Sequence, residues 1–248
     1  QPTKASHPGE SGNSCLEYLM QGANVVSPDK GVFLNTSWRM EPSITDVVSE
    51  LFYDGRLNAN NTNSINTIKW KKQYINSYGN IFPNQGLAFE SVSHQGCSVK
   101  SEEEIDLIEQ IVDSLLGGSY RHAQGDTDKT GVLTAKEILV TAPYNVQVNR
   151  LQQRLKGKAK VGTVDKFQGQ EAPVAIHSLT ASSSEDAPRG IGFLLEPNRL
   201  NVAISRAQCL SIIVGCPNLA TGVINTVDEA EQVNRLCKLM ITSEAQSS

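Results

Sequence analysis

Short apolar stretches alternate with amphipathic segments along most of this chain. Apolar runs typical of buried strands occupy residues 31–36, 87–92, 138–142, 161–164, 174–179 and 211–215. Between them, apolar residues recur every three or four positions, as in helices, after Ser43 and Ser101 and at about 145–155, 199–208 and 228–240. This alternation predicts an α/β fold whose mostly parallel sheet is covered by helices on both faces.

The helix starts carry recognisable caps. Ser43 is expected to cap a helix that ends near Gly55, and Ser101 with Glu104 has the spacing of a capping box. Thr226 and Glu229 have the same spacing ahead of the last helix. These signals place the helix boundaries more tightly than the apolar pattern does.

The polar segments indicate how the chain is divided. Residues 1–30 are rich in Ser, Gly, Pro and Asn, with one apolar stretch at 15–20, and we expect a connector arriving from a missing upstream domain. Residues 31–248 are expected to form one α/β domain. Within it, residues 56–86 are heavy in Asn and lack periodicity, which predicts a surface excursion.

Composition excludes several classes of protein. The 248 residues are 39% hydrophobic and 19% charged, as in an ordinary globular protein. No apolar run approaches the roughly 18 residues of a membrane span, so no membrane partner is expected. The five cysteines lack metal-ligand spacing, which predicts reduced thiols in a cytoplasmic protein without a metal site; they are Cys15, Cys97, Cys209, Cys216 and Cys237.

The net charge of −4 argues against a protein that coats nucleic acid by bulk electrostatics. Local basic clusters remain, one flanking Trp70 and a larger one in the segment 150–160. The first comprises Lys69, Lys71 and Lys72, and the second Arg150, Arg154, Lys156, Lys158 and Lys160. Each could be a nucleic-acid track or a solvated helix face, and the sequence leaves both open.

Four motifs carry the chemistry. They are Trp38-Arg-Met-Glu-Pro42, Ile138-Leu-Val-Thr-Ala-Pro-Tyr-Asn145, Val161-Gly-Thr-Val-Asp-Lys-Phe-Gln-Gly-Gln-Glu171 and Arg199-Leu-Asn-Val-Ala-Ile-Ser-Arg-Ala207. In this order they resemble motifs of the superfamily 1 helicases, the last two being similar to motifs V and VI. Segments 31–40, 50–57 and 182–190 resemble bacterial proteins of the Upf-like, 5′-to-3′ branch, several of which carry a preceding RecB-like nuclease domain.

One helicase motif is missing. No Gly-x-x-x-x-Gly-Lys-[Ser/Thr] phosphate loop occurs in the sequence. Gln1 and Pro2 fall about where the family's motif III ends. The resemblance therefore implies a second RecA-like domain, a P-loop NTPase fold without the P-loop, and residues 1–30 would lead from the ATP-binding domain.

The resemblance assigns roles at an ATP site. It implies that Arg39 and Arg206 meet the charge that develops on the transferred γ-phosphoryl group, for which the permanently charged guanidinium is suited. It also implies roles for Trp38 in stacking on adenine, Gln168 as a relay toward the phosphates, Gly169 in a close backbone approach, and Glu171 in binding the ribose. The cofactors would be ATP and Mg2+, both needing the missing first RecA-like domain. The related pattern is Arg-Met-His-Pro, so the role of Glu41 stays open.

The strand ends suggest a second ligand. Thr141, Pro143, Tyr144 and Thr163 follow predicted strands, and ligands of open α/β sheets gather at the carboxyl ends of strands. By resemblance these residues would contact a sugar-phosphate backbone. The expected partners are single-stranded nucleic acid, with DNA favoured over RNA, and the first RecA-like domain of the same parent chain.

Alternatives come from other classes of protein. The main hypothesis is half of an ATP-dependent helicase, inactive alone. A non-catalytic nucleic-acid-binding or scaffolding module is the rival, although joint retention of Arg39, Glu171 and Arg206 disfavours it. Residues 126–137 resemble an EF-hand calcium loop but lack a helix directly on each side. Residues 228–231 resemble a magnesium-binding box, but they follow motif VI instead of preceding motif III.

Overall fold

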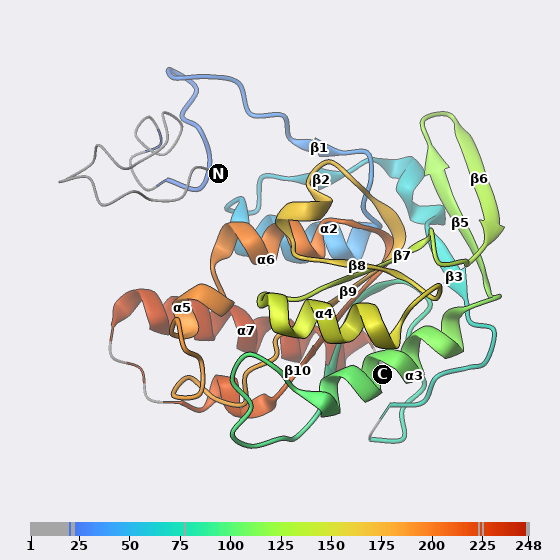
Figure 1. Ribbon diagram of the computed structural model, residues 1–248. Helices are drawn as coiled ribbons and strands as arrows, with labels where there is room; N and C mark the ends of the chain where they lie inside the picture. Colours follow the sequence, from blue (N-terminus) through green and yellow to red (C-terminus); the bar gives the residue numbers. More distant parts are fainter. Residues whose placement is uncertain (1–19, 21–22, 77, 223, 225, 247–248) are drawn as a thin grey trace.

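The centre of the fold is a five-stranded parallel sheet. The computed structural model describes residues 20, 23–76, 78–222, 224 and 226–246. Along the sheet the strands run β4 (Gly86–Ser91), β10 (Ala207–Gly215), β9 (Ala172–Ser178), β7 (Ile138–Thr141) and β8 (Lys160–Gly162). Every neighbouring pair is parallel, which confirms the predicted α/β fold. Figure 1 shows how the helices surround this sheet.

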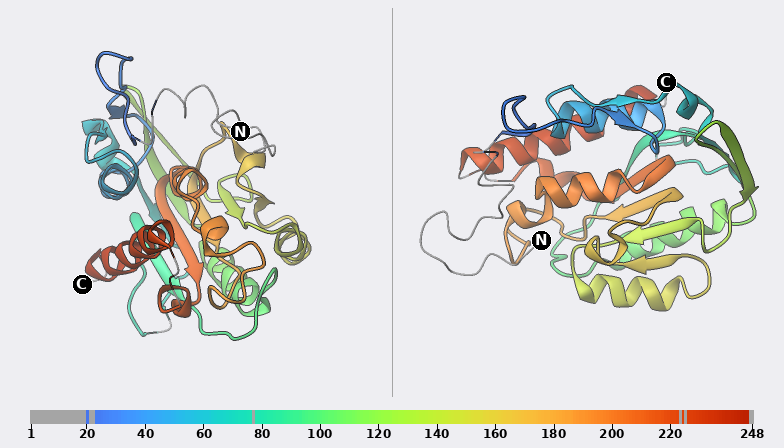
Figure 2. Two further views of the ribbon diagram at one scale, coloured as in Figure 1. Left: turned by 90° about the vertical axis from the view of Figure 1, so that its left-hand side faces the viewer. Right: turned by 90° about the horizontal axis from the view of Figure 1, so that it is seen from above.

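Helices cover both faces, in two layers (Figure 2, left). One apolar cluster unites a face of the sheet with α2 (Pro42–Phe52), α5 (Ile191–Leu194), α6 (Pro197–Ile204) and α7 (Val227–Gln246). The other cluster joins the opposite face to α3 (Glu102–Leu115) and α4 (Asn145–Arg154). Adjacent residues of one strand serve different clusters, Leu87 the first and Ala88 the second, as the two-residue pleat requires.

The predicted caps are confirmed at two helices and corrected at a third. Ser101 accepts a hydrogen bond from the Glu104 amide, and Thr226 accepts one from the Glu229 amide. Ser43 does not cap α2. That helix begins one residue earlier, at Pro42, and the carboxylate of Glu41 accepts from the amides of Ser43 and Ile44 at 2.8 and 3.2 Å. A negative charge suits this position because helix N-terminal amides are otherwise unpaired.

Two predicted elements differ from those observed. In the segment 31–36 only Thr36 is in a strand, β1 (Thr36–Ser37), which pairs with β2 (Asn58–Ala59). Val32 and Leu34 are 87% and 82% exposed, because no sheet edge takes up the segment. The helix expected at 199–208 ends at Ile204, since the strand β10 already begins at Ala207.

A small antiparallel sheet was not predicted. It contains β3 (Thr67–Lys69), β5 (Ser119–Gln124) and β6 (Thr127–Val132), and the β5–β6 hairpin stands out at one side of Figure 1. The calcium-like loop at 126–137 therefore has a strand on each side, β5 and β7, instead of helices. Asp128 pairs with Arg121 in the hairpin, and Glu137 accepts a hydrogen bond from Thr134. Over the described residues, no His, Cys, Asp and Glu side chains are grouped to hold a metal.

The Asn-rich segment lies partly in the core. Ile68, Tyr74 and Phe82 are buried against α3, although neighbouring residues of 56–86 are exposed. The segment also forms the 3₁₀ turn η2 (Asn61–Ile65); two further turns are η3 (Asp165–Phe167) and η4 (Pro217–Ala220). Most of the expected connector at 1–30, with Cys15, lies outside the described residues. None of the helices in the described ranges is long and apolar enough to cross a membrane.

Candidate functional site

Three motif segments converge at the amino ends of β9 and β10. Arg39 lies in the turn before α2, Glu171 directly before β9, and Arg206 directly before β10. The Nε of Arg39 donates to Glu171 at 2.5 Å, and one terminal nitrogen of Arg39 donates to the Ser205 carbonyl at 3.1 Å. The structure therefore brings the two arginines and the carboxylate to one place, although their motifs lie far apart in the sequence.

Arg206 carries the least satisfied charge of this site. It is 8% exposed, and one terminal nitrogen donates to the Gln170 carbonyl at 3.0 Å. Its Nε is buried and has no hydrogen-bond partner within the described structure. Burial and the nearby charge of Arg39 lower the pKa of Arg206 from its usual value, while Glu171 acts in the opposite direction. A buried donor without a partner costs free energy. A hydrogen bond from this Nε to a bound anion would remove that cost.

An open cavity adjoins Glu171, the carboxylate partner of Arg39. Trp38, Glu171 and Gln208 line a cavity of about 380 Å³, and the Trp38 side chain is 61% exposed. Exposed lysines from three segments surround the same cavity, namely Lys129, Lys136 and Lys160. A large exposed aromatic beside a carboxylate and positive charge offers stacking, hydrogen bonding and anion attraction in one place.

Two buried asparagines hold the Trp38–Met40 turn from beneath. Asn66 donates to the carbonyls of Arg39 and Gln208, both at 3.0 Å, and accepts from the Ala123 amide at 2.8 Å. Asn63 donates to the carbonyls of Ser37 and Met40. These residues lie in the segment expected to be a surface excursion. In the sequence, the Asn-rich composition of this stretch is the only sign of these two buried residues. The apolar pattern gives no indication that they are buried.

Gln168 and Gly169 lie in the loop that leads to Glu171. Gly169 has a φ of 81°, a conformation that glycine adopts without strain. A Cβ there would meet no atom within 4 Å, so the backbone angle is what demands glycine. Gln168 lines a separate cavity of about 110 Å³ with Asp165 and Arg199. The structure therefore does not bring Gln168 into the cavity of Trp38.

The predicted nucleic-acid residues lie at the carboxyl ends of β7 and β8, and they differ in exposure. Pro143 and Thr163 line a cavity of about 290 Å³. Thr141 is 4% exposed, and its hydroxyl is hydrogen-bonded to Nδ1 of His177 at 2.8 Å. Burial lowers the pKa of His177 to about 4. Tyr144 is also buried, and its ring lies 5.5 Å from that of Phe193.

One loop links the two ends of the sheet. Thr163 follows the carboxyl end of β8, and Glu171 precedes the amino end of β9. The residues between them contain only the short turn η3. The segment 161–171, which is similar to motif V, therefore connects the cavity of Thr163 directly to the site of Arg39 and Arg206.

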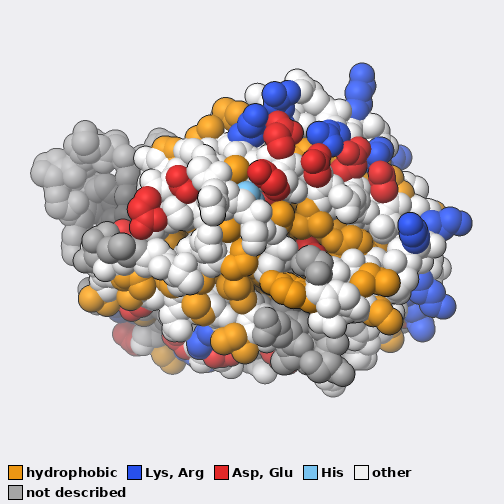
Figure 3. Space-filling model, turned by 90° about the horizontal axis from the view of Figure 1, so that it is seen from below, with side chains coloured by type: hydrophobic (Ala, Val, Ile, Leu, Met, Phe, Trp, Pro, Cys, Tyr) orange, Lys and Arg blue, Asp and Glu red, His pale blue; other side chains and the backbone are white. Residues whose placement is uncertain are grey.

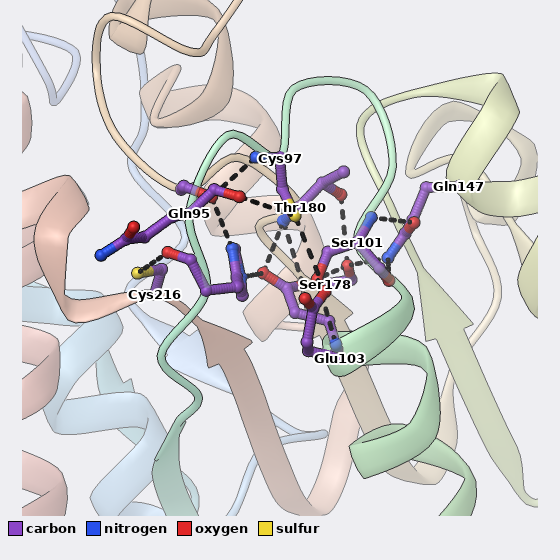
Figure 4. Close-up of polar contacts among 11 residues, drawn as sticks. Gln95, Cys97, Ser101, Glu103, Gln147, Ser178, Thr180 and Cys216 are labelled. Carbon is purple, nitrogen blue, oxygen red and sulfur yellow. Dashed lines mark hydrogen bonds and ion pairs between the residues drawn. The ribbon is translucent and has the colours of Figure 1, made fainter.

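A second polar cluster is fully buried at the other end of β9 (Figure 4). Glu104 accepts from the Ser178 hydroxyl at 2.5 Å and from the Thr180 amide at 2.9 Å. Nε2 of His94 lies 3.2 Å from the same carboxylate, and Gln147 donates to the Ser178 hydroxyl at 3.1 Å. Both oxygens of Glu104 thus have partners, and the hydrogen bonds of this cluster join α3 and α4 to the sheet.

Three of the five residues of the larger basic cluster form ion pairs. Arg150, Arg154 and Lys158 on and just after α4 pair with carboxylates of α3. The α3 carboxylates are Glu102, Asp106, Glu109 and Asp113. Figure 3 shows a face where acidic and basic side chains are intermixed, with apolar side chains beside them. Of the two interpretations left open, the solvated helix face fits α4.

Comparisons with known proteins agree with the motif interpretation. The family model described as "AAA domain" matches residues 12–218. MOV-10 of Gallus gallus, named as a helicase, is 30% identical over 237 residues, which are 82% of this chain and 23% of that protein. The Regulator of nonsense transcripts 1 homolog of Arabidopsis thaliana is 30% identical over 77% of this chain and 15% of its own.

A third relative is the DNA polymerase alpha-associated DNA helicase A of Schizosaccharomyces pombe, which is 30% identical over 75% of this chain. This chain spans 28% of that protein's length, and so is much shorter than each of the three relatives. The family model covers most of the chain, and all four motifs lie inside the matched range. The chain therefore belongs to this AAA domain family, within the superfamily 1 helicases.

Proposed function

We propose that this chain is the second RecA-like domain of an ATP-dependent helicase that moves along single-stranded nucleic acid. ATP with Mg2+ would bind between this domain and the first RecA-like domain of the parent chain. The observation that carries the proposal is the meeting of Arg39, Glu171 and Arg206 at the amino ends of β9 and β10. Support also comes from the buried Nε of Arg206, which has no hydrogen-bond partner among the described residues and is a donor suited to an anionic ligand.

The residues fit a nucleotide in shape and charge. The exposed Trp38 offers a face for the base, and Glu171 beside it can accept from ribose hydroxyls. ATP would supply the phosphoryl group that is transferred to water, and Mg2+ would neutralise part of the negative charge on the phosphates. Arg206 would stabilise the negative charge that grows on that group. Arg39 would do the same once Glu171 had exchanged its guanidinium partner for the ribose hydroxyls.

The nucleic-acid track is proposed at the carboxyl ends of β7 and β8. Pro143 and Thr163 line an open cavity there and would touch the sugar-phosphate backbone. Thr141 and Tyr144 are buried, so their part is to hold the loop in place from below. We favour DNA over RNA as the strand, a preference that matched oligo-dT and oligo-rU titrations test. A RecB-like nuclease domain in the parent is a further proposal, tested by the upstream sequence of its gene.

ATP hydrolysis by two proteins tests the proposal. Residues 1–248 alone should hydrolyse no ATP, because the sequence has no phosphate loop. The full-length parent should show strand-stimulated hydrolysis that both Arg39→Ala and Arg206→Ala remove. Turnover by purified 1–248 that survives both substitutions would place the active site elsewhere. Strand binding by the parent with no ATP hydrolysis at all would instead favour the non-catalytic binding module.

A further inference from the structure

A pair of arginines is assembled over one aromatic ring, outside the residues assigned so far. The guanidinium carbon of Arg189 lies 3.7 Å from the centre of the Phe193 ring, and that of Arg199 lies 4.4 Å from it. Arg189 precedes α5, Phe193 belongs to α5, and Arg199 lies in the first turn of α6. Contact with an aromatic face holds guanidinium groups in position without neutralising them.

The charges of this arginine pair are not cancelled. Within the described part of the chain, neither Arg189 nor Arg199 has a carboxylate within ion-pair distance. The contrast with Arg154, which pairs with Asp106 and Glu109, is direct. Two like charges held together without a counter-ion repel one another. An anion at this place would relieve that repulsion.

The pair borders the cavity proposed for nucleic acid. Arg189, Phe193 and Arg199 line the same cavity of about 290 Å³ as Pro143 and Thr163. Both guanidinium groups cover the Phe193 ring, so that ring is a support for the arginines and offers less surface for a base. The ligand chemistry that suits this place is a phosphate of the strand backbone.

We infer that Arg189 and Arg199, held over Phe193, bind phosphates of a single-stranded nucleic acid as it passes Thr163. This inference rests on the proposed function and adds a charged site to its track. Guanidinium forks suit phosphate oxygens because they donate two parallel hydrogen bonds. Arg199 also lines the cavity of Gln168, so the clearest measurement is strand binding in the absence of nucleotide.

The experiment measures how salt weakens strand binding by the full-length protein without nucleotide. Fluorescein-labelled oligo-dT and oligo-rU are titrated by anisotropy at a series of KCl concentrations, against Arg189→Gln and Arg199→Gln. Each variant should bind roughly three- to tenfold more weakly, and the slope of log K against log salt should fall by about 0.7 for each lost phosphate contact. Arg189→Lys should restore the slope, because it restores the charge.

Arg150→Gln is the matched control, because Arg150 is half exposed and pairs with Glu102 on the α3–α4 face. It should leave affinity and slope unchanged, and thermal unfolding checks that every variant is folded. If the wild-type protein binds no strand, both the proposed function and this inference are wrong. If the wild type binds but both glutamine variants behave like Arg150→Gln, only the inference fails. Loss of ATP binding with normal strand binding would likewise overturn it, since the anion would then be the nucleotide's.

Discussion

The two ends of β9 carry polar clusters that differ in how completely their groups are paired. At its carboxyl end, Glu104 is fully buried and both its oxygens accept hydrogen bonds from Ser178, Thr180 and His94. At its amino end, Glu171 is half exposed and the Nε of buried Arg206 has no partner among the described residues. In the first cluster the carboxylate oxygens of Glu104 have hydrogen-bond partners within the domain, whereas in the second the Nε of Arg206 has none among the described residues.

This difference separates stabilising groups from groups available to a ligand. A buried polar network is stable when every member is satisfied, since each unmatched group costs about 1–3 kcal/mol. An orphaned donor survives where something else compensates, as at a functional site. Position along the strand alone would not have distinguished the clusters, because open α/β sheets ordinarily bind ligands at the carboxyl ends. Here the fully paired cluster occupies that end of β9.

The sharpest test of the incomplete cluster is Arg206→Ala in the full-length protein. The kcat for strand-stimulated ATP hydrolysis should fall by about 10³-fold or more, the loss typical of an arginine finger. Strand binding without nucleotide should stay nearly normal, because Arg206 acts on charge that appears only in the transition state. Steady-state ATPase and anisotropy titrations measure the two effects, and near-normal turnover would remove Arg206 from the site.

The complete cluster should respond through stability instead. Glu104→Gln keeps the shape of the side chain but replaces one acceptor oxygen by a donor that faces Ser178 or Thr180. We expect a loss of about 2–3 kcal/mol in the free energy of unfolding, measured in urea. Glu231→Gln is the matched control, because Glu231 is exposed and, among the described residues, forms only an i,i+4 pair with Arg235; it should change the free energy of unfolding by less than about 0.5 kcal/mol. Equal losses in both variants would show that the Glu104 network adds no stability.

A pH titration tests the buried His177 near the carboxyl end of β9. The pKa of His177 is about 4 when folded, below its ordinary 6.5, because the ring is buried. Between these values only the unfolded chain takes up the proton, so stability falls as pH decreases. The free energy of unfolding should drop by about 2 kcal/mol from pH 7 to pH 5 on account of His177. His177→Gln should flatten this part of the curve, and parallel curves for the two proteins would contradict the prediction.

The smallest effects concern the two threonines of the proposed track. Thr163→Ala should weaken strand binding by several-fold on all homopolymers, since a neutral hydrogen bond contributes about 0.5–1.5 kcal/mol. Thr141→Ala should lower stability by a similar amount, because its hydroxyl is bonded to His177. Anisotropy and urea unfolding measure the two properties.

Thr130→Ala, in the exposed strand β6, is the matched control and should change neither binding nor stability appreciably. Impaired binding in Thr130→Ala with a normal Thr163→Ala protein would move the track to the β5–β6 hairpin.

Much of the fold followed from local patterns. The apolar strands β4, β7, β8, β9 and β10 and the helix α3 lie within a few residues of the ranges expected from sequence, because burial and period are properties of neighbouring residues. The antiparallel sheet escaped prediction because its strand β6 is polar and exposed. Pairing with β5 supports that strand, and its own side chains give no signal.

The motifs and their order indicated the helicase family, and the alternation of strands with helices indicated the parallel architecture, since both patterns are written in contiguous residues. The chemistry proposed for Arg39, Glu171 and Arg206 rests on the same motifs. Only the tertiary structure brought Arg39 against Glu171, which is 132 positions away, and placed Asn66 under the Gln208 backbone. It alone showed that Thr141 is buried while Thr163 lines a cavity. Such contacts depend on the order and register of the strands. A local sequence pattern predicts the secondary structure of a segment, but it does not say which other segment will pack against it.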